Sequence, residues 1–149
     1  MTDVEALTLA LDEARAGAAA GEVPVGAIMV ANGVVVGRGQ NRVLRDLDPT
    51  AHAEIVALRE AARTLGNYRL SGCELFVTLE PCAMCAGAMI HARISRLIYA
   101  AADPKAGAVS SVLQVLNHPQ LNHQMVVTSG ELAEESSELL RSFFRERRT

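Results

Sequence analysis

Two short motifs bring together residue types that could hold a metal ion and do chemistry on it. One is His-Ala-Glu, and the other, about one helix and one strand later, is Pro-Cys-Ala-Met-Cys. His52, Cys82 and Cys85 offer one nitrogen and two sulfur ligands, a set that suits zinc. Three protein ligands leave the fourth position of a tetrahedral zinc ion open to water, whose pKa the metal lowers to about 7. Glu54 is not needed as a ligand, so its carboxylate is free to carry protons.

A Cys-x-x-Cys pair also has other uses, as a redox dithiol or as half of a structural zinc site. A structural site needs a fourth Cys or His. The remaining candidates do not form a second ligand-spaced pair; they are Cys73, His91, His118 and His123. Because two motifs coincide and each carries its own accessory residue, catalytic zinc is the favoured interpretation. We expect Cys73 and His91 to be structural.

The combination of His-x-Glu with Pro-Cys-x-x-Cys is typical of zinc-dependent base deaminases. In that chemistry Glu54 would take a proton from water, and the water oxygen would attack an amine-bearing ring carbon. Glu54 would then pass the proton to the ring nitrogen and help ammonia leave. A carboxylate at a helix start could instead simply stabilise the helix dipole. Its place between the ligands favours the catalytic role.

The hydrophobic pattern predicts the elements that must position these residues. Helices are expected at 4–18, 48–64, from 81 onward, at 109–116 (a short one) and at 131–147, and strands at 25–31, 34–39, 74–79, 94–100 and 125–128. Asn32-Gly33 predicts a hairpin between the first two strands. The order of elements indicates an α/β fold with a mixed five-stranded sheet and helices on both faces, in which strands 74–79 and 94–100 run parallel.

Both motifs fall at predicted helix starts. His52 and Glu54 are two residues apart and would diverge by roughly 200° in a regular helix, so they converge only in the first turn. Cys82 and Cys85 are three apart and share a helix face. Two helix N-termini would then point at one metal ion, and their dipoles would favour its thiolates.

Bulk properties indicate one cytoplasmic domain. The 149 residues, half of them hydrophobic, are expected to form a single deaminase domain over 1–149. Three cysteines, two of them in the metal motif, indicate a reducing compartment. The acidic N-terminus does not resemble a signal peptide, and no apolar run approaches a membrane span.

Charge is unevenly distributed along the chain. The net charge of −3 argues against a generic nucleic-acid binder. The last nine residues, however, carry Arg141, Arg145, Arg147 and Arg148 against Glu146 alone. This basic tail suits one contact with a phosphate backbone, or it could only complement a helix dipole.

Longer segments around the motifs resemble bacterial tRNA-specific adenosine deaminases, which belong to the zinc-dependent cytidine and deoxycytidylate deaminase superfamily. The likeness covers roughly residues 4–148. The segments that carry it are 21–27, 48–54, 67–70, 78–91, 103–107, 117–119, 122–123 and 143–145. The resemblance implies a three-layer, cytidine-deaminase-like α/β/α fold. It implies hydrolysis of adenosine to inosine at the wobble position of a tRNA anticodon, typically an arginine tRNA. It also implies a homodimer that binds the anticodon stem-loop across both subunits, with one zinc ion per subunit and no organic cofactor.

Residue by residue, the resemblance makes His52, Cys82 and Cys85 the metal ligands and Glu54 the proton shuttle. The flipped nucleoside would be bound by Asn41 in a pocket lined by Val23, Leu79 and the Ala53 backbone. Contacts to the RNA loop would come from Asp103, Lys105, His118, Phe144, Arg145 and Arg147. Asn41 could alternatively be a polar cap of a strand end, and Phe144 could pack in the core.

Two departures concern the RNA contacts. Val43 stands where some members of the family have Pro, which bears on the backbone at the pocket edge. Aromatic residues make up only 3% of the chain, so stacking on RNA bases must be sparse.

Two rival functions remain. One is deamination of a free base or nucleotide, of the guanine or cytosine type, with the same zinc and the same Glu54. The other is a non-catalytic zinc-binding scaffold, against which the presence of Glu54 counts. The basic tail and the segments that flank the motifs favour tRNA.

Overall fold

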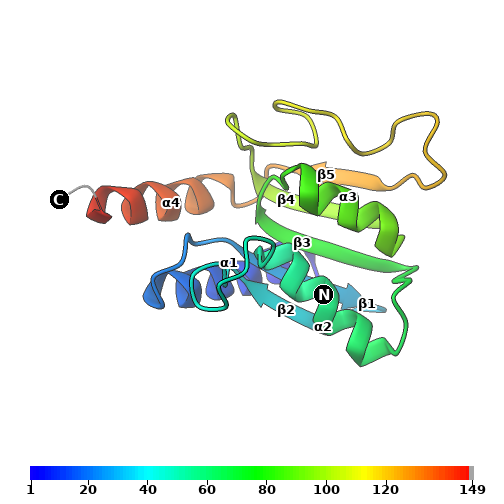
Figure 1. Ribbon diagram of the computed structural model, residues 1–149, viewed down its shortest axis with the longest axis horizontal. Helices are drawn as coiled ribbons and strands as arrows, with labels where there is room; N and C mark the ends of the chain where they lie inside the picture. Colours follow the sequence, from blue (N-terminus) through cyan, green and yellow to red (C-terminus); the bar gives the residue numbers. More distant parts are fainter. Residues whose placement is uncertain (148–149) are drawn as a thin grey trace.

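The structure of the protein is a computed structural model that describes residues 1–147 (Figure 1). At its centre lies one five-stranded sheet in the order β2-β1-β3-β4-β5. The strands are β1 (Gly26–Ala31), β2 (Val34–Gln40), β3 (Cys73–Leu79), β4 (Arg96–Ala101) and β5 (Val126–Ser129). The helices are α1 (Asp3–Ala19), α2 (Ala53–Leu65), α3 (Ala83–Ala92) and α4 (Ala133–Arg147).

The sheet is mixed, as predicted. β1 pairs antiparallel with β2 through the predicted Asn32-Gly33 turn and antiparallel with β3 on its other side. β3 and β4 are parallel, and so are β4 and β5. Since β2 and β3 are both antiparallel to β1, β2 runs in the same direction as β3, β4 and β5. The segments that follow these four strands therefore all begin at one edge of the sheet.

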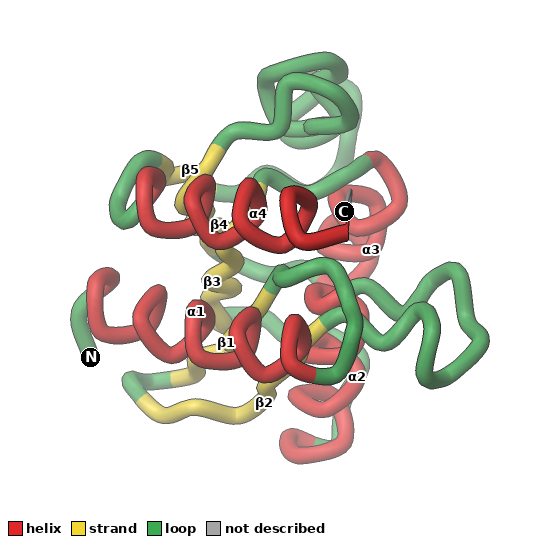
Figure 2. Tube along the Cα trace, turned by 90° about the vertical axis from the view of Figure 1, so that its left-hand side faces the viewer, coloured by secondary structure: helices red, strands yellow, loops and turns green. Residues whose placement is uncertain are grey.

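Helices cover both faces of the sheet. Helices α2 and α3 lie on one face and α1 and α4 on the other (Figures 1 and 2). Neighbouring strand residues alternate between the two layers, as the pleat requires. Met29 packs in the cluster that contains Ala57 of α2 and Met89 of α3, whereas Ile28 packs with Leu7 of α1. The three-layer α/β/α prediction is confirmed.

The short helix predicted around 109–116 is wrong. In this segment the chain forms only turns and irregular backbone. The backbone N–H groups of Val109, Ser110 and Ser111 donate to the carboxylate of Glu80. The next two N–H groups, those of Val112 and Leu113, both donate to the carbonyl oxygen of Gly107, so the i→i−4 hydrogen bonds of an α-helix do not form here.

Helix α2 begins later than predicted, at Ala53 and not near residue 48. The side chain of Asp48 accepts hydrogen bonds from the N–H and the hydroxyl of Thr50, which closes a local turn before the helix. His52 is extended, with ψ of 154°, and occupies the N-cap position. The helix therefore starts at the motif itself, which leaves His52 in front of the first turn and Glu54 inside it.

Helix α2 lies with its backbone directly against β2. A Cβ atom on Gly39 would collide with the carbonyl oxygen of Ala53, and the facing helical residues, Ala53 and Ala57, are also small and fully buried. No side chain separates the two backbones at this point. The position of the first turn of α2 is therefore set by the surface of β2.

Among the described residues, no helix is long and apolar enough to cross a membrane.

We predict that Gly39→Ala displaces the start of α2. The added methyl group would meet backbone atoms, which cannot rotate away. Overpacking of this kind should lower the free energy of unfolding by about 1–3 kcal/mol. Because Ala53 adjoins the expected ligand His52, the substitution Gly39→Ala should also reduce the metal content of the purified protein. Gly87→Ala is the matched control, since a Cβ at that position in α3 meets nothing within 4 Å. Unchanged melting and metal content in Gly39→Ala would refute the close-packing argument.

Candidate metal and active site

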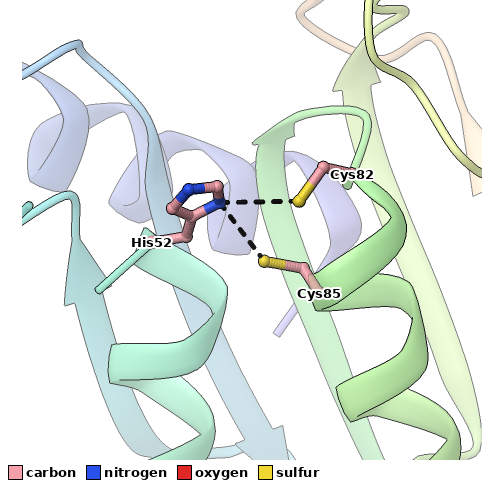
Figure 3. A group of neighbouring side chains, drawn as sticks. All are labelled: His52, Cys82 and Cys85. Atoms are coloured by element: carbon pink, nitrogen blue, oxygen red, sulfur yellow. Dashed lines mark hydrogen bonds between the residues drawn. The ribbon is translucent and has the colours of Figure 1, made fainter. Parts of the chain in front are cut away.

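His52, Cys82 and Cys85 meet at the N-terminal ends of two helices. His52 is the N-cap residue of α2, and Cys82 is the N-cap residue of α3. Neither side chain caps its own helix; both point toward the space between the helices (Figure 3). His52 Nδ1 lies 3.6 Å from Cys82 Sγ and 3.5 Å from Cys85 Sγ. All three ligand atoms lie within 4.8 Å of one another, so the group could hold a metal ion.

Within the cluster, the surroundings of Cys82 favour its thiolate form. Hydrogen bonds from Cys85 and His52 lower the pKa of Cys82 to about 3, although burial acts in the opposite direction. The bond to Cys82 and burial both raise the pKa of Cys85, and the interaction with Cys82 also raises the pKa of His52. A metal ion that binds both sulfur atoms and Nδ1 must displace these protons. Metal affinity should therefore fall as the pH is lowered.

Glu54 lies in the first turn of α2 and is buried. Burial raises the pKa of Glu54 to about 6. The charge of His52 acts to lower this pKa, but its effect is smaller than that of burial. A carboxyl group in this range can accept and return a proton near neutral pH, as a general acid and base must. It reaches the same cavity as His52 and Cys82. The structure thus places the predicted proton shuttle beside the predicted ligands.

A cavity of about 500 Å³ opens at the metal cluster. This volume is in the range of small-ligand sites. Besides the cluster and Glu54, five residues predicted from the sequence line the cavity: Val23, Asn41, Leu79, Asp103 and Arg147. Val43, which the sequence placed at the pocket edge, also lines the cavity. The lining further includes residues that the sequence did not single out: Glu22, Leu44, Glu80, Ala106 and Phe143. All of these except Leu44 lie within segments that carry the family resemblance, and that was the only signal in the sequence.

Asn41 forms the polar cap given as its alternative role, and it also lines the cavity. Its side-chain N–H₂ group donates to the carbonyl oxygen of Val23 over 3.2 Å, and its Oδ1 accepts from the N–H of Ala53 over 2.9 Å. These bonds tie the end of β2 to the first residue of α2 and to Val23, which also lines the cavity. Asn41 is thus a polar cap that also faces the cavity. Its contact with a nucleoside stays a prediction.

Several predicted RNA contacts do not line the cavity. Lys105 and His118 are exposed in the long segment between β4 and β5. Phe144 is 45% exposed, so the alternative that it packs in the core is wrong; the buried residue is its neighbour Phe143. The guanidinium group of Arg145 is bound to Glu138 over 2.9 Å. Arg148 of the basic tail lies outside the described residues.

Arg147 is the basic tail residue that reaches the cavity. Its guanidinium carbon lies 3.7 Å from the centre of the Phe143 ring, a cation–π contact. Both side chains line the cavity from the last turns of α4. Cys73 is buried in the core and His91 is exposed on α3, and neither belongs to the metal cluster.

Comparison with known proteins agrees with this geometry. Residues 1–148 match the model of the MafB19-like deaminases. A guanine deaminase from Nitrosomonas europaea superposes with a TM-score of 0.80 at 29% identity, over 94% of this chain and 83% of that one. The fold and the site therefore define the protein as a deaminase.

Two further matches are more similar. A tRNA-specific adenosine deaminase from Haemophilus influenzae is 48% identical over 147 residues, which are 98% of this chain and 85% of that protein. The solved structure of a tRNA:A34 deaminase, described in work on A-to-I editing at the wobble position of transfer RNA, superposes with a TM-score of 0.88. It is 48% identical, and the match covers 91% of this chain and 99% of that one. The chain belongs to the family of tRNA-specific adenosine deaminases, as the sequence segments predicted.

We predict that the three-residue cluster binds one metal ion per chain. Cys82→Ser removes a sulfur ligand and should weaken metal binding by more than about 100-fold, since even the loss of a residue that supports a ligand costs 10–100-fold. Cys73→Ala is the control, because this thiol is buried away from the cluster. Elemental analysis after dialysis measures both. Full metal content in Cys82→Ser would mean that the ligand set is different.

Proposed function

We propose that this protein is a zinc-dependent enzyme that converts adenosine to inosine at the wobble position of a tRNA anticodon and releases ammonia. The observation that carries the proposal is the meeting of His52, Cys82 and Cys85 beside buried Glu54 in one cavity. The family to which the chain belongs supports adenosine in tRNA as the substrate. An arginine tRNA is the species that we expect.

The distances within the cluster support zinc as the metal. Zn–S bonds of about 2.3 Å and a Zn–N bond of about 2.0 Å, at tetrahedral angles, place nitrogen and sulfur about 3.5 Å apart. The observed separations of His52 Nδ1 from the two sulfur atoms are 3.5 and 3.6 Å. One nitrogen and two thiolates also suit zinc better than they suit magnesium or calcium, which prefer oxygen ligands. One zinc ion per subunit is therefore proposed.

The metal ion, Glu54 and the apolar lining of the cavity would each have a separate role in the reaction. Zinc, when bound, would lower the pKa of a water molecule and so supply a nucleophile at neutral pH. Glu54 would accept the proton from that water and deliver it to the ring nitrogen of the base, for which its pKa of about 6 is suited. The apolar side chains of Val23 and Leu79 would hold the faces of the extruded base. Burial of Glu54 keeps bulk water away from the shuttled proton.

Deamination of a free base is the second candidate function. The likeness to a guanine deaminase favours it, because the fold and the class of chemistry are shared. The site alone does not separate a free purine from an extruded one. Incubation with an anticodon stem-loop that has adenosine at the wobble position, and separately with guanine, cytosine and deoxycytidylate, tests both. Ammonia release only from the free bases would overturn the tRNA proposal.

We predict that Glu54→Ala keeps the fold and the metal but loses turnover by at least about 10²-fold, because it removes the proton shuttle and no ligand. The measurement is inosine in the stem-loop after incubation, with metal content determined on the same sample. Glu60→Ala, an exposed carboxylate on the same helix, is the matched control and should remain active. Substantial turnover by Glu54→Ala would assign the acid and base roles elsewhere.

The basic tail supports a contact with the RNA backbone, now centred on Arg147. Arg147→Gln should weaken binding of the stem-loop and reduce the slope of log affinity against log salt by about 0.7, the value for one phosphate contact on a single strand. Arg145→Gln should have a smaller effect, since Arg145 must first give up Glu138. Fluorescence anisotropy across a salt series measures the slope. An unchanged slope with a loss of about 0.3–1 kcal/mol in stability would make the tail a helix cap only.

We also propose a homodimer. A shallow groove between α2 and α3 is lined mostly by apolar side chains. Four of them are partly exposed and would be buried by a second copy of the chain: Ile55, Ala62, Ala88 and Ala92. On α3, the side chain of Met84 is 37% exposed, whereas that of Met89 is fully buried within the chain. Sedimentation equilibrium at several concentrations tests the oligomeric state.

A cytoplasmic location of the protein stays a prediction.

A further inference from the structure

Glu80 is a buried carboxylate with an unusual number of hydrogen bonds. It lies at the end of β3, two residues before Cys82, and is 2% exposed. Its Oε2 accepts from three successive backbone N–H groups, those of Val109, Ser110 and Ser111, over 3.1, 2.9 and 3.0 Å. Its Oε1 accepts from the N–H of Asp103 over 3.0 Å and from the hydroxyl of Ser111 over 2.5 Å. Five donors from one loop therefore converge on one side chain.

The loop over residues 103–111 is folded around this carboxylate. A Cβ atom on Gly107 would collide with the carboxyl group of Glu80, so only glycine leaves room there. The N–H of Ala108 donates to the carbonyl oxygen of Pro81 over 2.8 Å, which joins the loop to the residue just before the first cysteine ligand. The loop therefore has a fixed position relative to the metal cluster.

The same loop forms one wall of the cavity. Asp103 and Ala106 line it, and Oδ1 of Asp103 accepts from the N–H groups of Lys105 and Ala106 over 3.0 and 3.3 Å. The side chain of Asp103 is thus oriented by its own loop, and the loop is oriented by Glu80. Contacts therefore link Glu80, which precedes the ligand motif, to Asp103 and Ala106, which would face the substrate.

No Lys or Arg within residues 1–147 forms an ion pair with Glu80. Its charge is stabilised by N–H and O–H groups alone. These bonds lower the pKa of Glu80 to about 2, although burial raises it. Burying a charge without a counterion is costly unless every hydrogen bond to it is well placed. The arrangement therefore favours one loop conformation over all others.

A second buried carboxylate at the cavity also binds backbone N–H groups. Glu22 is 2% exposed, and its carboxylate accepts from the N–H groups of Leu44 and Arg45 over 3.2 and 2.9 Å. Unlike Glu80, it also forms an ion pair with the guanidinium group of Arg45. Leu44 and Val43 also line the cavity. Two buried carboxylates thus hold two loops that border one cavity.

We propose that Glu80 is a positioning residue for the substrate: through the loop at 103–111 it sets where Asp103 stands relative to the metal cluster, and so governs capture of the substrate and not the metal or the proton shuttle. The kinetic consequence rests on the proposed function. The structural consequence, a loop held by one carboxylate, does not.

Hydrogen exchange tests the structural consequence without any substrate. Glu80→Gln keeps the shape of the side chain but replaces one acceptor oxygen with a donor. Amide exchange at Asp103, Val109, Ser110 and Ser111 should become at least about tenfold faster, because exposed loops exchange rapidly once their hydrogen bonds are lost. Amides in the middle of α2 and α3 should be unchanged. Equal exchange at the four loop amides in both proteins would overturn the proposal.

Steady-state kinetics on the anticodon stem-loop test the positioning role. Glu80→Gln should raise KM by about tenfold or more while kcat changes much less, since a wall that contacts the substrate away from the reacting atoms contributes binding that is the same in the ground state and the transition state. Metal content should stay at the wild-type value. Faster exchange with an unchanged KM would make Glu80 merely structural and overturn the proposal. No inosine from the wild-type protein would instead refute the proposed function, and hydrogen exchange would still decide whether Glu80 holds the loop.

Two further variants keep the test sharp. Ser111→Ala removes one of the five donors at an exposed residue, so it should fold and show the same KM effect at a smaller size, even if Glu80→Gln is insoluble. Glu74→Gln is the matched control: it lies on the same strand, at the other end, and breaks an ion pair with Arg96. It should lower the melting temperature with no change in KM. A KM increase in Glu74→Gln equal to that in Ser111→Ala would show that general destabilisation explains the effect.

Discussion

Strands β2, β3, β4 and β5 run in one direction, and this shared direction determines where the residues of the site lie. The segment after β2 carries Asn41 and leads to His52, the segment after β3 carries Glu80 and Cys82, and the segment after β4 carries Asp103. All three begin at the carboxyl edge of the sheet, where ligand sites of α/β folds occur. Helices α2 and α3 leave this edge on the same face, so their N-termini come together. A metal centre at this place needs no long connection.

The cavity has an unusual charge balance. Its walls contain four acidic residues, Glu22, Glu54, Glu80 and Asp103, and its basic residue is Arg147 at the end of α4. Backbone N–H groups bind the carboxylates of Glu22 and Glu80, together with the guanidinium group of Arg45 at Glu22 and the hydroxyl of Ser111 at Glu80, so these charges are directed into the walls and away from the interior. The interior can then accept an uncharged base. Phosphate groups, which are anionic, are better received outside, near Arg147.

The chemistry of the site was predictable from sequence because its residues lie in two compact motifs at helix starts. Ligand spacing, the Asn32-Gly33 hairpin and the alternation of apolar residues are local signals, and the structure agrees with the elements they predict. The walls were not predictable in the same way. Glu80 binds the backbone of a loop more than twenty residues away, and the segment expected to be a helix around 109–116 belongs to this irregular stretch of chain. Phe143 and Phe144 are adjacent, and only tertiary packing decides that Phe143 is the one that turns inward.

The wall contributed by α4 has a consequence for the order of events during synthesis. The metal ligands, and the strands β1 to β4 that support them, are complete once residue 101 has been made. Phe143 and Arg147 follow much later, which at about 5–20 residues per second is a delay of a few seconds. If the cluster binds a metal ion as proposed, a nascent chain could bind it before it has a closed pocket for a base. Loading of the metal and selection of the substrate would then be separated in time, with α4 as the last wall to be added.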